Sequence, residues 1–362
     1  MRYLEIKELL EKKIEKLPPN TRLASRPSLC EELETTRTTL DRAIDMLEKE
    51  GKLYSKKGSG TYVSGNVLIE DIKIDDMGDN WGIIVHNVMD EVYTGIVRGV
   101  ENVANRYGIN LILCNSDANV KKQMQYIKRL INSNVSGFIL VPVISDDYRE
   151  NYMLYRQLTD IDIPFVFCNR SIEGIQAPCV TSNDFYGGYI ATKHLIEHGY
   201  RKIAYVAQRR YRTSIDRCQG YLSALAENGL EICWDRIRIP KTAEERFDRE
   251  AIQRLILEKD FVDAIFCFND NVALNVIHEI VRCGKQVSSD IGIIGYDDSD
   301  ICRTLIPRLT SVSYNSVEIG QTAAEVLLRR SGRLPASPNH LDYYLHQPKI
   351  VVRESCLGST SG

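Results

Sequence analysis

From Trp81 onward, short β-forming runs alternate with helical stretches, and this alternation limits the folds that the chain can adopt. The β runs include WGIIVH, INLILC, VSGFILV, IPFVFC, RKIAYVA, VDAIFCF and IGIIGY. Apolar residues recur at helical spacing between them, near residues 91–107, 120–133, 184–199, 214–229, 244–258 and 270–284. Such alternation predicts an α/β fold with parallel sheets, and about 270 residues suffice for two lobes.

The first 64 residues show a different pattern, with apolar residues at helical spacing that end at Pro18. A short helix is expected near residues 28–33 and a longer one from 37 to 49. Two β runs then follow at 53–55 and 61–63, joined by a Lys-Lys-Gly-Ser-Gly turn. Three helices and a small hairpin predict a winged helix-turn-helix domain.

Four threonines surround one arginine in TTRTTLDRAI, where the longer helix begins. One hydroxyl can cap the helix, but hydroxyls, free N–H groups and an arginine at a helix start also suit phosphates and base edges. The net charge of −3 requires that any nucleic-acid surface be local. A capped surface helix with a lysine-rich turn is the alternative. The candidate DNA contacts are Thr36, Arg37, Thr38, Thr39, Arg42, Lys56, Lys57 and Gly58.

The acidic stretch 65–80 loses apolar periodicity, so we expect a DNA-binding domain at 1–64, a linker at 65–80 and a second domain at 81–355. The ten cysteines form no CxxC pair and indicate free thiols in a reducing compartment. The first residues lack the apolar core of a signal peptide, and no apolar run approaches the roughly 18 residues of a membrane span. A cytoplasmic protein without membrane contact is expected.

One motif suggests enzymatic chemistry, because the run from His194 to His198 fits H-x-x-E-H, which can bind a catalytic metal. It lies in a segment where a helix is expected to lead into a strand. No phosphate-binding G-x-x-x-x-G-K-[ST] run is present, and no G-x-G-x-x-G follows the first strand. We therefore expect no catalytic residue, no metal and no cofactor.

Residues 23–63, LASRPSLCEELETTRTTLDRAIDMLEKEGKLYSKKGSGTYV, resemble the DNA-binding domain of the GntR regulator family. The resemblance implies DNA contacts for Arg37, Thr38, Thr39 and Gly58. Two departures stand out. Ala24-Ser25-Arg26-Pro27 replaces the usual Pro-Ser-Glu-Arg, which makes Arg26 the candidate for the missing DNA-contacting arginine. Asp41 replaces a frequent arginine, for which Arg42 is the candidate substitute.

Residues 81–352 resemble the sugar-binding domain of LacI-type repressors, itself similar to periplasmic sugar-binding proteins. The matching runs include NDFYGGYIATKHLIEHGYRKIAYV, RCQGYLSAL, FCFNDNVALNVI and IGIIGYDD. The family binds its effector between two lobes, at the carboxyl ends of the strands. The lobes would span about 81–182 with 310–334 and 183–309 with 335–355. The effector contacts implied by position are Asp90, Tyr93, Asn169, Arg170, Arg217, Asn269 and Asp297, although each could be an ordinary strand-end cap.

A GntR-like head joined to a LacI-like body resembles the arabinose operon repressor subgroup. The resemblance implies a sugar-responsive regulator that binds a palindromic operator as a homodimer. L-arabinose, L-fucose or a related monosaccharide is the expected effector, and Tyr314 stands where many relatives carry glutamine. A sugar-binding protein for transport, without a regulatory role, is the alternative.

Overall fold

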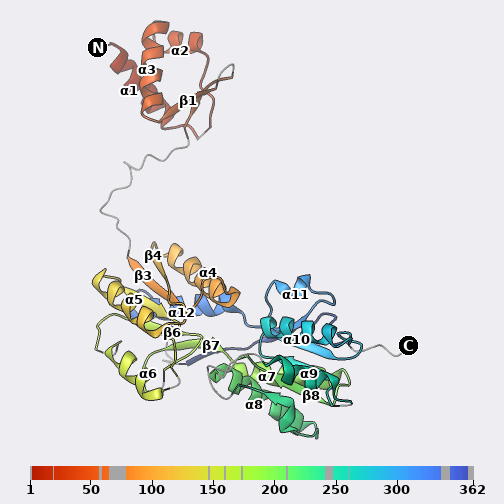
Figure 1. Ribbon diagram of the computed structural model, residues 1–362. Helices are drawn as coiled ribbons and strands as arrows, with labels where there is room; N and C mark the ends of the chain where they lie inside the picture. The colour runs from red at the N-terminus through yellow and green to blue at the C-terminus, as the bar shows by residue number, and fades with distance from the viewer. Residues whose placement is uncertain are drawn as a thin grey trace. The chain divides into compact units, whose positions relative to one another are not determined.

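The computed structural model describes residues 2–18, 20–56, 59–64, 79–145, 147–158, 160–172, 174–208, 211–240, 248–259, 261–335 and 343–357. The chain divides into two compact units, Met1–Met77 and Gly78–Gly362 (Figure 1). Each unit is described by itself. The acidic segment predicted as a linker lies outside the described residues, apart from its last two positions.

The first unit has the predicted order of three helices and a hairpin. The helices are α1 (Arg2–Ile14), α2 (Arg26–Glu32) and α3 (Arg37–Lys49), and the antiparallel strands are β1 (Leu53–Lys56) and β2 (Gly60–Val63). The apolar stripe of α3, formed by Leu40, Ile44 and Leu47, is buried against residues of all these elements. Burial of that stripe confirms the winged helix-turn-helix prediction.

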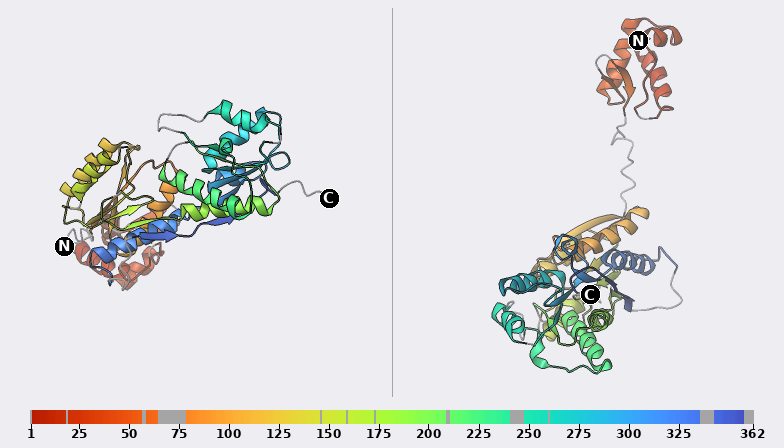
Figure 2. Two further views of the ribbon diagram at one scale, coloured as in Figure 1. Left: turned by 90° about the horizontal axis from the view of Figure 1, so that it is seen from below. Right: turned by 90° about the vertical axis from the view of Figure 1, so that its right-hand side faces the viewer.

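The second unit contains two six-stranded sheets, visible side by side in Figures 1 and 2. The first has the order β13-β7-β6-β5-β3-β4, and its recorded strand pairs are all parallel. Its strands are β3 (Asn80–Val85), β4 (Asn110–Asn115), β5 (Gly137–Leu140), β6 (Phe165–Cys168), β7 (Cys179–Ser182) and β13 (Tyr343–His346). The helices of this lobe are α4 (Glu91–Arg106), α5 (Val120–Asn132), α6 (Tyr148–Tyr155) and α12 (Ser316–Arg330).

The second sheet has the order β14-β12-β11-β10-β8-β9 and is parallel except for β14 at its edge. Its strands are β8 (Ile203–Val206), β9 (Ile237–Arg238), β10 (Ala264–Cys267), β11 (Gly292–Asp297), β12 (Thr310–Ser313) and β14 (Lys349–Val351). The helices of this lobe are α7 (Asp184–Glu197), α8 (Arg212–Glu227), α9 (Arg249–Leu257), α10 (Asp270–Arg282) and α11 (Ile301–Thr304).

The structure corrects the predicted lobe boundaries in two places. We expected residues 310–334 in lobe one, but β12 pairs with β11 in the second sheet, and the chain crosses to the first lobe only before α12. We expected residues 335–355 in lobe two, but β13 pairs with β7 in the first sheet. Short strands carry no local signal of which sheet they will join, because membership depends on pairing with distant segments.

Close backbone contact between α7 and α8 determines the shape of one wall of the second lobe. A Cβ added at Gly188 would lie 2.0 Å from the Arg217 carbonyl oxygen, and one at Gly220 would lie 2.0 Å from the Phe185 carbonyl oxygen. These two positions therefore require glycine. The resulting contact places the side chain of Arg217 against Asp184. No helix in the described part of the chain is long and apolar enough to cross a membrane.

Candidate DNA-binding surface and effector cavity

The first turn of α3 presents polar side chains outward, as the sequence predicted. Arg37 is 80% exposed, and Thr36 and Thr38 are exposed as well. Thr36 occupies the N-cap position, but its hydroxyl makes no capping bond; it lies 2.9 Å from the Thr39 hydroxyl instead. A simple capping role therefore does not account for these threonines.

Arg26, the candidate replacement for a DNA-contacting arginine, has partners within its own domain. Its Nε donates to Asp41 Oδ1 at 2.9 Å, and its Nη1 donates to Thr61 Oγ1 at 2.8 Å. The side chain is 28% exposed, much less than Arg37. These bonds use the Nε and Nη1 donors of its guanidinium. A DNA contact of Arg26 stays a prediction.

The hairpin carries an aromatic pair beneath one of the predicted lysines. The rings of Tyr54 and Tyr62 stack with centres 5.5 Å apart, and Lys56 Nζ lies 5.7 and 5.5 Å from the two ring centres. Arg42 is exposed on α3. Lys57 and Gly58, predicted at the hairpin tip, lie outside the described residues.

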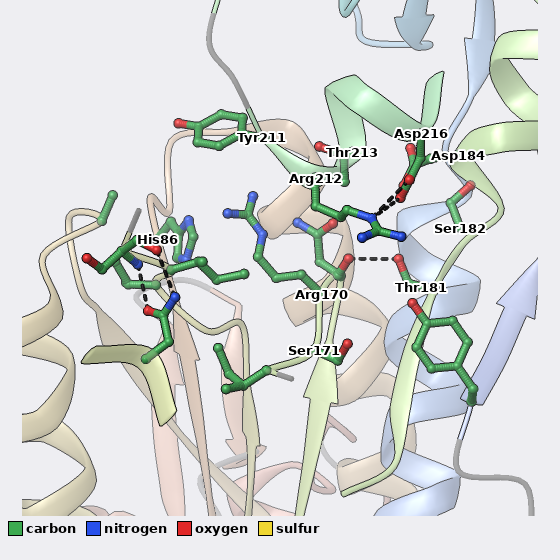
Figure 3. Close-up of a pocket in the computed structure, with 18 of the residues that line it drawn as sticks. His86, Arg170, Ser171, Thr181, Ser182, Asp184, Tyr211, Arg212, Thr213 and Asp216 are labelled. Carbon is green, nitrogen blue, oxygen red and sulfur yellow. Dashed lines mark hydrogen bonds and ion pairs between the residues drawn. The ribbon is translucent and has the colours of Figure 1, made fainter. Parts of the chain in front are cut away.

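A cavity of about 910 Å³ opens in the second unit, lined by residues of both lobes (Figure 3). One group follows strands of the first sheet and includes His86, Asn169 and Arg170, while another starts α8 in the second lobe. Arg170 extends into the space between His86 and Arg212. The polar lining is completed by Ser145, Glu150, Asn151, Ser171, Thr181, Ser182, Asn183, Asp184, Tyr211, Thr213, Asp216 and Tyr343.

Two of the predicted effector contacts line this cavity. Asn169 follows β6 with a φ of 69°, and its Oδ1 accepts from the Tyr314 hydroxyl at 2.8 Å. The Arg170 guanidinium lies 5.1 Å from the ring centre of Tyr211, which belongs to the other lobe. Within the described residues, Arg170 Nε is buried and has no hydrogen-bond partner. A buried donor without a partner is costly, so a ligand acceptor here would be favourable.

Arg217 is placed behind the cavity wall and does not line it. Its Nε donates to Asp184 Oδ1 at 2.7 Å, and its Nη1 donates to the Phe268 carbonyl at 2.5 Å. Its guanidinium carbon lies 3.4 Å from the centre of the Tyr296 ring. Arg217 is 3% exposed and Asp184 is 6% exposed. Arg217 therefore holds Asp184, which does line the cavity, in place.

Asn269 follows β10 and Asp297 is the last residue of the neighbouring β11, and both lie outside the cavity lining. The Asn269 side chain accepts from Val272 N–H at 2.9 Å, which is the capping role that the sequence left open. Asp297 has a φ of 103°, a strained conformation for a residue other than glycine, and lies 3.9 Å from Arg217. Burial raises the pKa of the Asp297 carboxyl, although Arg217 opposes the rise.

Asp90 and Tyr93 also lie outside the lining, and Tyr93 interacts with two residues of the lining, His86 and Arg170. Asp90 caps α4 by accepting from Val92 N–H at 3.0 Å. The Tyr93 hydroxyl lies 3.3 Å from His86 Nδ1, and His86 lines the cavity. Burial raises the pKa of Tyr93 to about 12, with smaller effects from the charges of Arg170 and Asp90. Burial and the Arg170 charge lower the pKa of His86 to about 3, so its ring is neutral at physiological pH.

Sequence reasoning missed several lining residues, chiefly His86, Asp184, Tyr211 and Asp216. His86 ends the run WGIIVH, so the strand-end argument could have found it. Asp184 was missed because β7 before it was not predicted. The H-x-x-E-H run begins on α7 and ends at His198, the residue that caps this helix, and the centres of its two histidine rings are 4.1 Å apart. No group of three potential metal ligands occurs among the described residues.

Comparison with known proteins assigns both units to families. Residues 2–63 match the bacterial regulatory proteins of the gntR family, and residues 192–356 match a periplasmic binding protein-like domain. The arabinose metabolism transcriptional repressor of Geobacillus stearothermophilus is 28% identical over 361 residues, covering 98% of this chain and 97% of that protein. The HTH-type transcriptional repressor PurR of Aliivibrio salmonicida is 30% identical over 275 residues, covering 76% and 80%.

Solved structures agree on the fold of the second unit. A LacI family transcriptional regulator from Enterococcus faecium with bound ribose has a TM-score of 0.62 and 25% identity, covering 76% of this chain and 98% of that one. The transcriptional regulator CelR in complex with cellobiose has a TM-score of 0.65 at 24% identity, covering 88% and 90%. The chain therefore belongs to the bacterial transcriptional repressors that join a DNA-binding domain of the gntR family to a periplasmic binding protein-like domain of the LacI type, and not to an enzyme family.

Proposed function

We propose that the protein represses transcription by binding operator DNA as a homodimer in the cytoplasm, and that a monosaccharide in the cavity changes its affinity for the operator. The observation that carries the proposal is a cavity lined by polar groups from both lobes of the second unit, on the same chain as an exposed arginine at the start of α3. L-arabinose, L-fucose or a related sugar is the proposed effector, supported by the relatives named as arabinose metabolism repressors.

The chemistry of the lining suits a sugar. Carboxylates such as Asp184 and Asp216 accept hydrogen bonds from hydroxyls. The buried Nε of Arg170, which has no partner among the residues that the structure describes, can donate one. Tyr211 and Tyr343 provide ring surfaces for the C–H side of a sugar. Since these groups come from both lobes, a bound sugar would stabilise one arrangement of the lobes over others. Such coupling is typically about 1–3 kcal/mol, which changes operator affinity by roughly 5–150-fold.

The test begins with duplexes selected by the purified protein from a random-sequence DNA library. Fluorescence anisotropy then measures affinity for a selected duplex with and without L-arabinose, L-fucose and other monosaccharides. We expect at least one sugar to shift both the affinity and the thermal unfolding midpoint. Arg170→Met should abolish the sugar effects and leave DNA binding unchanged. If the protein selects no DNA sequence, the proposed operator binding is refuted. If a sugar binds without changing the affinity for DNA, the result would instead support a transport-type role.

A further inference from the structure

Two of the residues by which the first unit departs from the GntR pattern, Arg26 and Asp41, contact each other. Arg26 stands where the family has glutamate, and Asp41 stands where it frequently has arginine. Arg26 begins α2 and Asp41 lies in α3, yet Arg26 Nε donates to Asp41 Oδ1 at 2.9 Å. In this chain the two departures therefore form an ion pair with each other.

The same arginine reaches the hairpin. Its Nη1 donates to Thr61 Oγ1 at 2.8 Å, and Thr61 is 3% exposed on β2. The Thr61 hydroxyl also lies 2.7 Å from that of Ser55 on β1. A planar guanidinium can hold two acceptors in fixed directions, which a lysine ammonium does less well. Arg26 therefore joins α2, α3 and the hairpin into one unit through Asp41 and Thr61.

The second carboxylate oxygen of Asp41 faces the exposed arginine of α3. Arg37 Nε lies 3.7 Å from Asp41 Oδ2, and the two residues are one helical turn apart on the same face. Because Arg37 is 80% exposed, little packing restricts its side chain. Asp41 thus contacts both the arginine that holds the hairpin and the arginine predicted to read DNA.

We propose that Asp41 is a positioning residue for DNA recognition. One oxygen anchors Arg26 and so the hairpin, and the other orients the fork of Arg37 toward a base edge. In this arrangement Arg26 has a structural role and does not bind phosphate. The inference rests on the proposed operator binding and assigns a source of specificity within it.

Electrostatics makes this role distinguishable from simple stabilisation. A carboxylate on a surface that meets DNA repels phosphates and lowers the affinity for every sequence. Asp41 can still favour the correct sequence if it orders Arg37, because bidentate contact with a guanine requires the fork in one orientation. Specific and non-specific affinity should then respond in opposite directions when the charge is removed.

The test compares Asp41→Asn with Asp45→Asn, which removes an exposed acid one turn further along the same helix. Anisotropy titrations use the duplex that the parent protein selects and a duplex of scrambled sequence. We expect Asp41→Asn to weaken binding to the selected duplex by about tenfold, in the lower range for a lost bidentate contact. Binding to the scrambled duplex should become tighter, because a charge that repels phosphates is lost. Asp45→Asn should weaken neither. Arg26→Lys, which keeps the charge, should lower specificity as Asp41→Asn does.

Each alternative predicts another outcome. If Asp41 only repels DNA, Asp41→Asn will tighten binding to both duplexes. If it only stabilises the fold, binding to both will fall together with the thermal unfolding midpoint. If Arg26 binds phosphate, Arg26→Lys will keep the parent's specificity. Any of these results overturns the inference, whereas a parent protein that selects no sequence overturns operator binding itself.

Discussion

Replacing Arg217 tests how the wall of the effector cavity is held in place. Its guanidinium is buried, bonds to Asp184 at 2.7 Å and to the Phe268 carbonyl at 2.5 Å, and lies against the Tyr296 ring. Arg217→Met replaces the arginine with another unbranched side chain, which is apolar, and so removes the charge and both hydrogen bonds. The carboxylate of Asp184, which is 6% exposed, then loses its buried cation.

The expected cost follows from the burial of both partners. Removing one partner of a buried ion pair typically costs about 3–5 kcal/mol, because the remaining charge is left uncompensated. We expect the free energy of unfolding of the second unit to decrease by about 3–5 kcal/mol. For a domain of this size each kcal/mol lowers the unfolding midpoint by about 2–4 °C, which gives a fall of roughly 6–20 °C.

Urea unfolding monitored by tryptophan fluorescence measures the stability of the second unit. The two tryptophans of the chain, Trp81 and Trp234, both belong to the second unit. Arg212→Met is the matched control on the same helix, since its pair with Asp216 leaves Arg212 73% exposed. An exposed pair contributes only about 0–1 kcal/mol, so the control should unfold almost like the parent.

The pH dependence supplies the refuting measurement. Burial raises the pKa of Asp184 and Arg217 opposes that rise, so Arg217→Met should raise it further. When the pKa of a carboxyl is higher in the folded state than in the unfolded state, the protein loses stability as the pH rises from the unfolded-state pKa to the folded-state pKa. The deficit of the variant should therefore shrink from neutral to mildly acidic pH and shrink when Asp184→Asn is added. A deficit below about 1 kcal/mol, or one that grows on acidification, would refute the buried-pair argument.

Three further changes test other parts of the molecule. Arg37→Ala should cost about 1–3 kcal/mol of specific DNA affinity and leave the sugar response intact. Lys57→Ala should instead weaken binding to all duplexes alike. If Arg37→Ala binds the selected duplex like the parent in anisotropy titrations, the assignment of α3 as the DNA-reading helix is wrong. Asp297→Ala should lower sugar affinity at least about tenfold, or ~1.4 kcal/mol, by calorimetry, and an unchanged affinity would place the sugar wholly among the cavity-lining residues. Limited proteolysis should cut first within 65–80 and leave a sugar-binding fragment that begins near Trp81; early cleavage inside the second unit would contradict that layout.

The sequence was sufficient to predict the features that depend on neighbouring residues. The alternation of β runs and helices predicted a two-lobed α/β unit, and the predicted bounds of α3 agree with the structure. The stripe of Leu40, Ile44 and Leu47 identified its buried face. Caps such as Asp90 and Asn269 were recognisable as strand-end residues. Periodicity and capping are local, because they depend on residues within a few positions of one another.

Tertiary structure decided the features that depend on distant pairing. The run CVTS forms β7, fully buried between β6 and β13, although four residues without a strong apolar pattern give little signal. The partners of Arg26 lie 15 and 35 positions away, so its role inside the first unit could not be read from its surroundings in the chain. Arg217 was predicted as an effector contact, but the packing of α8 against α7 places it behind Asp184 and outside the cavity lining. Which charges meet is determined by how separate elements approach, and that geometry has no counterpart in local periodicity.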